Sequence, residues 1–212
     1  MTQLTKIQTA INTASYTMNE KAEELGMEEP MGDEFPEEPA GEEELELAER
    51  LVEWFPFADM ARFAKNGSDV TTGAVRAARA YTGRDVVLCC GYHGWHDWFI
   101  GTTTRSIGVP EDTRKLTIPF PYNNITEFKA LISEYRGDIA AVIMEPIGIE
   151  EPRPGYLEQI RKITSTENIV LVFDECWSGF RVDLKGAAGK YGVFPDLGCY
   201  GKALGNGVPI AA

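Results

Sequence analysis

Long apolar runs, a secretory leader pattern and a dense cysteine framework are all missing from this sequence of 212 residues. No stretch approaches the ~18 apolar residues that a transmembrane helix needs, so no membrane partner is expected. Residues 1–7 lack the charged-then-apolar layout of a signal peptide, which predicts a cytoplasmic protein. Buried reduced thiols are favoured over disulfides, because apolar strand-like runs contain or flank all four cysteines: Cys89, Cys90, Cys176 and Cys199.

Positive charge is also scarce, and the formal net charge is −13. Between Glu20 and Glu53 there are fifteen acidic residues against Lys21 and Arg50, so this stretch carries the whole imbalance and the remainder is neutral overall. Such a surface argues against nucleic acid or anionic lipid as a partner. We interpret residues 1–40 as a partly irregular, solvated acidic arm. A tail that recruits a partner protein is the alternative.

Beyond the arm, apolar runs of strand length alternate with segments of helical spacing. A first amphipathic helix is predicted at residues 42–54. The predicted strands are residues 86–90, 140–144, 169–173 and 197–200. Apolar residues recur at helical spacing between them, over residues 70–81, 125–135 and 157–163. This alternation, with continuously apolar strands, predicts a three-layer α/β/α domain with a mostly parallel sheet at residues 41–212.

Charged side chains follow three of the predicted strands, at Glu145, Asp174 and Lys202. Ligands of such sheets gather beyond the carboxyl ends of the strands. A lysine and an acid placed there suit Schiff-base chemistry on a cofactor whose ring nitrogen needs an anionic partner. Asp174 follows five apolar residues, so its carboxylate must find a partner. The alternatives to a ring nitrogen are a cap on the following turn or an ion pair with Arg181. Nothing in the sequence fixes the role of Glu145.

A possible anion site precedes the helix predicted to start near Val70. The motif Asn66-Gly67-Ser68-Asp69 offers backbone N–H groups, a hydroxyl and the positive end of a helix dipole. The alternative is that Ser68 or Asp69 simply caps the helix.

Aromatic residues and glycines alternate in residues 90–98, directly after a predicted strand. A flat ring such as that of Tyr92 can stack on a heteroaromatic cofactor there, and ordinary core or interface packing is the alternative. A zinc site would use Cys90, His93 and His96. This spacing matches no standard zinc-ligand pattern, so no metal is expected.

Taken together, these motifs resemble the class III pyridoxal-phosphate aminotransferases, and in particular their glutamate-1-semialdehyde 2,1-aminomutase-like branch. The resemblance covers about residues 42–212 and depends on five motifs in the family order: residues 66–69, 91–94, 145–146, 174–181 and 200–207. It implies a fold type I large domain that is incomplete at its C-terminus, because the chain ends ten residues after the lysine. It also implies a homodimer in the complete enzyme.

The resemblance further implies the cofactor, pyridoxal 5′-phosphate (PLP), and its contacts. Lys202 matches the Schiff-base lysine, and Asp174 matches the partner of the pyridine nitrogen. The other implied contacts are Tyr92 (ring stacking), Gly67 and Ser68 (phosphate) and His93 (no specific role).

The implied reaction moves an amino group between a primary amine or amino acid and a carbonyl substrate. The alternatives are an intramolecular aminomutase of the glutamate-1-semialdehyde type, a racemase or decarboxylase on the same scaffold, and a catalytically silent truncated relative that only binds partners.

Overall fold

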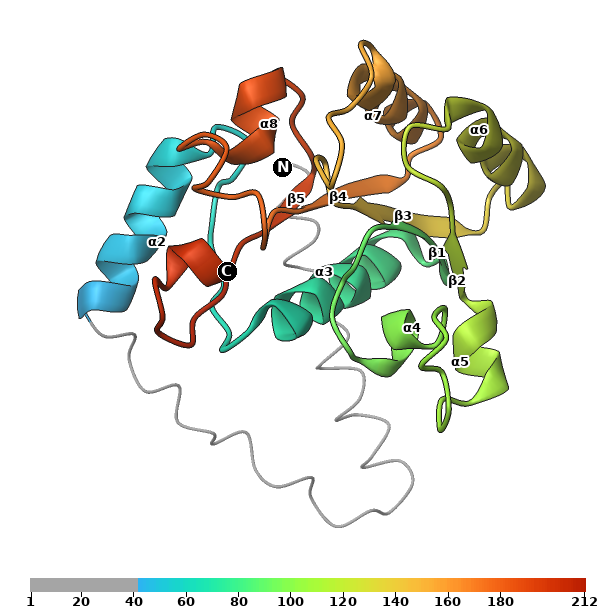
Figure 1. The fold of residues 1–212 in the computed structure, drawn as a ribbon, viewed down its shortest axis with the longest axis horizontal. Coiled ribbons are helices and arrows are strands. Elements are labelled where there is room, and N and C mark those ends of the chain that lie inside the picture. The colour runs from blue at the N-terminus through green and yellow to red at the C-terminus, as the bar shows by residue number, and fades with distance from the viewer. Residues whose placement is uncertain (1–41) are drawn as a thin grey trace.

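The computed structural model describes residues 42–212, so the predicted acidic arm at residues 1–40 lies outside the described part (Figure 1). Five parallel strands form one sheet in the order β2-β1-β3-β4-β5. Their bounds are Val86–Cys90 for β1, Thr117–Pro119 for β2, Ile139–Met144 for β3, Val170–Asp174 for β4 and Leu197–Cys199 for β5. The prediction of a parallel sheet in an α/β/α domain is confirmed.

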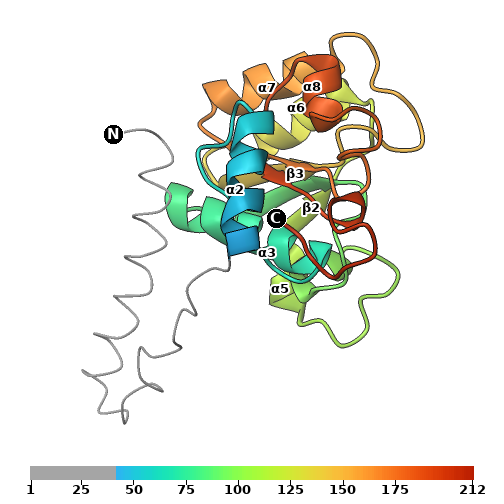
Figure 2. The same ribbon diagram turned by 90° about the vertical axis from the view of Figure 1, so that its left-hand side faces the viewer.

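Helices cover both faces of this sheet. Figure 1 shows α6, α7 and α8 on one face and α3, α4 and α5 on the other. In Figure 2, which turns the left-hand side of Figure 1 toward the viewer, α2 lies in front. The bounds are Glu42–Trp54 for α2, Gly67–Thr82 for α3, Asp97–Ile100 for α4, Glu111–Lys115 for α5, Ile125–Glu134 for α6, Tyr156–Thr166 for α7 and Gly186–Tyr191 for α8. A short 3₁₀ turn, η1, spans Lys202–Leu204. Within residues 42–212, no helix combines the length and apolarity that crossing a bilayer requires.

The strands separate two hydrophobic cores because successive side chains point to opposite faces. In β1, Leu88 and Cys90 join the core under α6 and α7, whereas Val87 and Cys89 join the core under α3 and α4. All four cysteines are buried free thiols, as predicted. Burial raises the pKa of Cys89 and of Cys90 to about 12, so both thiols are neutral at physiological pH.

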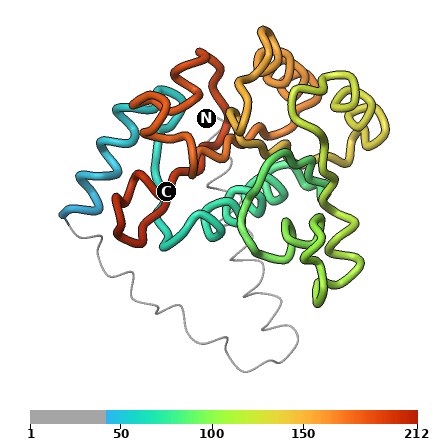
Figure 3. The backbone as a smooth tube through the Cα atoms, in the orientation of Figure 1, coloured from blue at the N-terminus to red at the C-terminus, as the bar shows by residue number. Residues whose placement is uncertain are grey.

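The long elements predicted from periodicity are confirmed, and five short elements were not predicted. The missed elements are β2, α4, α5, α8 and η1, of three to six residues each. A segment this short contains too few side chains to display a period. The end of the chain lies beside the segment that enters α3 (Figure 3), where Ala64 and Ala211 form an isolated antiparallel bridge.

Glu175, the residue after β4, ties α8 to the sheet. Its side chain is fully buried and accepts hydrogen bonds from the Ser178 hydroxyl (2.6 Å) and from the backbone N–H groups of Ala187 (2.8 Å) and Ala188 (2.9 Å). Burial raises the pKa of this carboxyl, while the three donors act in the opposite direction. Glu175 is therefore a structural acid that holds the start of α8.

We predict that Glu175→Gln lowers the free energy of unfolding by about 1–3 kcal/mol. A glutamine amide has one acceptor oxygen, so at least one of the donors at Ala187 and Ala188 loses its partner. Chemical denaturation measures the change, with the exposed Glu158→Gln on α7 as the matched control. Equal stability of the two variants would contradict the assignment.

Candidate functional site

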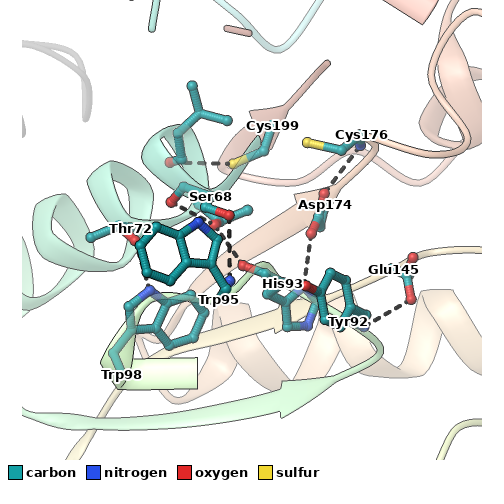
Figure 4. Close-up of polar contacts among 12 residues, drawn as sticks. Ser68, Thr72, Tyr92, His93, Trp95, Trp98, Glu145, Asp174, Cys176 and Cys199 are labelled. Carbon is teal, nitrogen blue, oxygen red and sulfur yellow. Dashed lines mark hydrogen bonds and ion pairs between the residues drawn. The ribbon is translucent and has the colours of Figure 1, made fainter. Parts of the chain in front are cut away.

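Residues from α3 and from the carboxyl ends of the strands surround one cavity of about 310 Å³. This volume lies in the range of small-molecule sites. The cavity is lined by Asn66, Gly67, Ser68, Tyr92, His93, Gly94, Trp95, Asp174, Cys176 and Lys202. All six site residues predicted from the sequence therefore meet in one place, although they come from four separate segments of the chain. Glu145 lies beside them and contacts Tyr92 (Figure 4).

Asp174, the last residue of β4, is a buried carboxylate with two partners. Its Oδ2 lies 2.8 Å from Nδ1 of His93, and its Oδ1 accepts the backbone N–H of Cys176 at 3.1 Å (Figure 4). A carboxylate can only accept, so Nδ1 of His93 carries the proton. Asp174 therefore caps the turn that follows β4 through the N–H of Cys176, which was one of the alternatives that the sequence left open. No ion pair joins Arg181 to Asp174 among residues 42–212.

The imidazole of His93 is enclosed by aromatic rings. It stacks on Trp98 with an interplanar angle of 12° and a centroid distance of 6.3 Å, and it meets Phe99 edge-on at 5.1 Å. Its Nε2 is buried and has no hydrogen-bond partner within the described residues. These contacts hold the imidazole in one orientation, with Nδ1 hydrogen-bonded to the carboxylate of Asp174.

Tyr92 and Trp95 present their rings at the cavity, with 57% and 68% of their surface exposed. Tyr92 is held from behind through its backbone, because Glu145 Oε2 accepts its N–H at 3.0 Å. Burial raises the pKa of Glu145, and the Tyr92 N–H opposes this shift. Glu145, whose role the sequence left undetermined, anchors the start of the aromatic loop, defined as residues 91–98, which ends in the first two residues of α4.

Helix α3 begins at Gly67, three residues before the predicted start, and its cap is Asn66 rather than Ser68 or Asp69. The Asn66 side chain accepts the N–H groups of Ser68 (2.9 Å) and Asp69 (3.2 Å). Asparagine is a strong N-cap because its short side chain reaches these N–H groups. The Ser68 Oγ accepts the Trp95 N–H at 3.4 Å, and its own proton has no acceptor among residues 42–212.

Lys202 follows β5 and adopts a left-handed backbone conformation with φ of 44°. Such a conformation is strained for a residue other than glycine, and strain of this kind concentrates at functional sites. Within the described residues, no hydrogen bond or ion pair involves the Lys202 side chain, which leaves its amine available to a ligand in the cavity.

The two histidines of the zinc alternative have other partners. His93 is bonded to Asp174, and His96 Nδ1 lies 2.8 Å from the Thr72 hydroxyl. No cluster of three potential metal ligands occurs in the part of the chain that the structure describes.

Known proteins resemble this chain in sequence and in fold. The sequence profile of the family described as "Aminotransferase class-III" matches residues 37–212. The 3-aminobutyryl-CoA aminotransferase of Cloacimonas acidaminovorans is 41% identical over 172 residues, which are 78% of this chain and 41% of that protein. The glutamate-1-semialdehyde 2,1-aminomutase of Desulfotalea psychrophila is 42% identical over 186 residues, 80% of this chain and 43% of that protein. The chain thus spans less than half the length of these curated relatives.

A solved structure agrees with the sequence comparisons. The FumI protein of Sphingopyxis sp. MTA144, whose solved form contains PLP, is 34% identical and superimposes with a TM-score of 0.76. The match covers 81% of this chain and 43% of that one.

Gly94 provides a test of how tightly the aromatic loop packs on α3. It has φ of 102°, and a Cβ added there would overlap the Ser68 side chain, lying 2.8 Å from its Cβ. Gly108 has a similar φ of 92° but open space around it. We predict that Gly108→Ala costs about 1–3 kcal/mol of stability from backbone strain alone. Gly94→Ala should cost at least about 1 kcal/mol more through overpacking. Denaturant unfolding of both variants measures the difference, and equal losses would contradict the close packing.

Proposed function

The chain belongs to the class III aminotransferase family, and we propose that its cavity moves an amino group between a primary amine or amino acid and a carbonyl substrate. One observation carries this proposal: the amine of Lys202 and the buried carboxylate of Asp174 line the same cavity. The expected partners are therefore small molecules, namely amines and carbonyl compounds.

The family indicates PLP as the cofactor, and the groups around the cavity fit it. PLP, when bound, supplies a carbonyl carbon that captures amines and a pyridine ring that accepts electrons from the substrate carbon. The cavity offers an amine at Lys202, a carboxylate at Asp174, an exposed aromatic ring at Tyr92 and the start of a helix at Gly67 and Ser68. These are the four kinds of group that such a ligand needs.

We assign Lys202 as the covalent attachment point and the proton carrier. Among the residues that line the cavity, it is the one that carries an amine. With PLP and substrate bound, a free Nζ would take a proton from the substrate carbon and return one later. The strained backbone at Lys202 supports this assignment, because the surrounding fold keeps the amine at the cavity despite the cost.

We assign Asp174 as the partner of the cofactor ring nitrogen. Each of its oxygens keeps a lone pair beyond the hydrogen bonds to His93 and Cys176. A buried carboxylate beside a ring N–H favours the protonated ring, which is the form that accepts electrons. His93 holds the carboxylate in place through its Nδ1–H.

We assign Tyr92 as the ring that packs on the cofactor, and Gly67 and Ser68 as its phosphate contacts. Because Asn66 already takes the N–H groups of Ser68 and Asp69, the groups left for an anion are the Gly67 N–H and the Ser68 hydroxyl. The positive end of the α3 dipole adds to their attraction for a phosphate.

We also propose a homodimer and a cytoplasmic location. The exposed rings of Tyr92 and Trp95 beside the cavity form an apolar surface that a second copy could cover. Four free thiols suit a reducing compartment.

The second candidate activity is an intramolecular aminomutase, and the likeness to the Desulfotalea psychrophila protein supports it. Product analysis separates it from a transaminase, since an aminomutase needs no second substrate.

The first test is binding of PLP. The protein should become yellow with PLP and keep the cofactor through borohydride reduction and gel filtration. Loss of all PLP under these conditions would reject the proposed function.

We predict that Lys202→Ala abolishes covalent attachment of PLP, because it removes the amine. Noncovalent binding should persist through Asp174 and Ser68. Mass spectrometry after borohydride treatment should place the phosphopyridoxyl group on Lys202, and Lys190→Ala serves as the control that retains it. A phosphopyridoxyl group found on Lys65 or Lys190 would refute the assignment.

We predict that Asp174→Asn still binds PLP but slows the proton-transfer step by at least ~100-fold, roughly 3 kcal/mol of transition-state stabilisation. Asparagine preserves the shape and removes the charge. Asp183→Asn is the matched control, because Asp183 also accepts the backbone N–H two residues ahead, from Lys185 at 2.8 Å, but does not line the cavity. Single-turnover kinetics of an active enzyme measure the rate of this step. A near wild-type rate for Asp174→Asn would mean that Asp174 has a structural role only.

A further inference from the structure

Helix α3 also contacts the aromatic loop through the side chain of Thr72, which does not line the cavity. We propose that Thr72 is a positioning residue: through Trp98 it fixes the plane of His93, and so the carboxylate of Asp174. This inference rests on the proposed function, in which Asp174 contacts the cofactor. Thr72 itself touches neither cofactor nor substrate.

The hydroxyl of Thr72 makes two contacts with the loop. Its Oγ1 accepts the indole Nε1–H of Trp98 at 2.8 Å and lies 2.8 Å from Nδ1 of His96. An indole N–H can only donate, so one lone pair of the hydroxyl is used by Trp98. The hydroxyl proton has no other acceptor within residues 42–212, so it points at Nδ1 of His96. The His96 proton is then on Nε2, which faces Asp69 at 3.8 Å.

The indole held by Thr72 contacts His93, and His93 lines the cavity. Trp98 is buried and lies nearly parallel to the imidazole of His93, at 12°. The other restraints on that imidazole plane are the hydrogen bond to Asp174 and the edge-on contact with Phe99 at 5.1 Å. If the indole loses its hydrogen bond, it can rotate, and the stacked imidazole can tilt away from the line to the carboxylate. Thr72, Trp98, His93 and Asp174 thus form one series of contacts, part of which appears in Figure 4.

The series predicts opposite tautomers for the two histidines. His93 carries its proton on Nδ1, because the carboxylate of Asp174 is its partner, whereas His96 carries its proton on Nε2. The chain contains two histidines in all, so long-range ¹H–¹⁵N NMR spectra assign both without ambiguity.

The experiment compares Thr72→Val, which removes the hydroxyl at similar volume, with Thr72→Ser, which keeps it. Thr166→Val on α7 is the control for replacing a helical threonine, since its hydroxyl bonds back to Lys162 on the exposed surface. Thr72→Val should turn His96 into a mixture of tautomers, shift the His93 ring resonances and raise the apparent Kd for PLP about tenfold, the scale of one lost hydrogen bond. Thr72→Ser and Thr166→Val should each stay within twofold of the unsubstituted protein.

Unchanged His93 resonances in folded Thr72→Val, together with a Kd within twofold of Thr166→Val, would overturn the proposal. If Thr72→Val does not fold, Thr72→Ala removes the same hydroxyl and leaves the Trp98 ring in place, and the same two readouts decide with it. If the unsubstituted protein does not bind PLP, the proposed function fails. The shift or constancy of the His93 resonances still decides whether Thr72 positions that ring.

Discussion

The charge of Asp174 is the constraint on which the site depends. A carboxylate at the buried end of an apolar strand is stable only with hydrogen-bond donors around it. The fold supplies one donor locally, the Cys176 N–H, and a second from His93, which lies 81 residues earlier in the chain. Because His93 must reach Asp174, the loop after β1 has to cross above β3 toward the end of β4. That path brings Tyr92 to the same cavity.

The parallel sheet holds these site residues rigidly in place. Hydrogen bonding continues past the strand ends: Glu145 N donates to Cys90 O at 3.0 Å, and Glu175 N donates to Cys199 O at 2.8 Å. Residues placed on such extensions share the order of the sheet core and are held more firmly than residues on free loops. The hydroxyls of α3 add restraint from the other side, since Thr71 donates to the His93 carbonyl at 2.9 Å. Hydrogen bonds within the protein therefore hold the residues that line the cavity.

Backbone conformations with positive φ occur in the aromatic loop and at Lys202. Gly91 and Gly94 take positive φ values that let the aromatic loop pack against Glu145 and Ser68 without a Cβ. Lys202 takes a positive φ with a full side chain, which costs more. The Asn206 N–H donates to the Lys202 carbonyl at 3.1 Å, and this bond helps to hold the strained turn.

The sequence by itself determined the parallel α/β architecture and the six candidate site residues. Apolar runs and their period report directly which face of a strand or helix is buried, and residues that follow strands must gather at one edge of a parallel sheet. It did not determine the partners of those residues. Glu175 resembles Asp174 as a strand-end acid, yet it turns inward to hold α8, and Asn66 caps α3 in place of Ser68. Only the tertiary structure decided that His93 bonds Asp174 and that Glu145 bonds Tyr92, because these hydrogen bonds join segments far apart in the chain, and only the assembled sheet brings such segments within reach of each other.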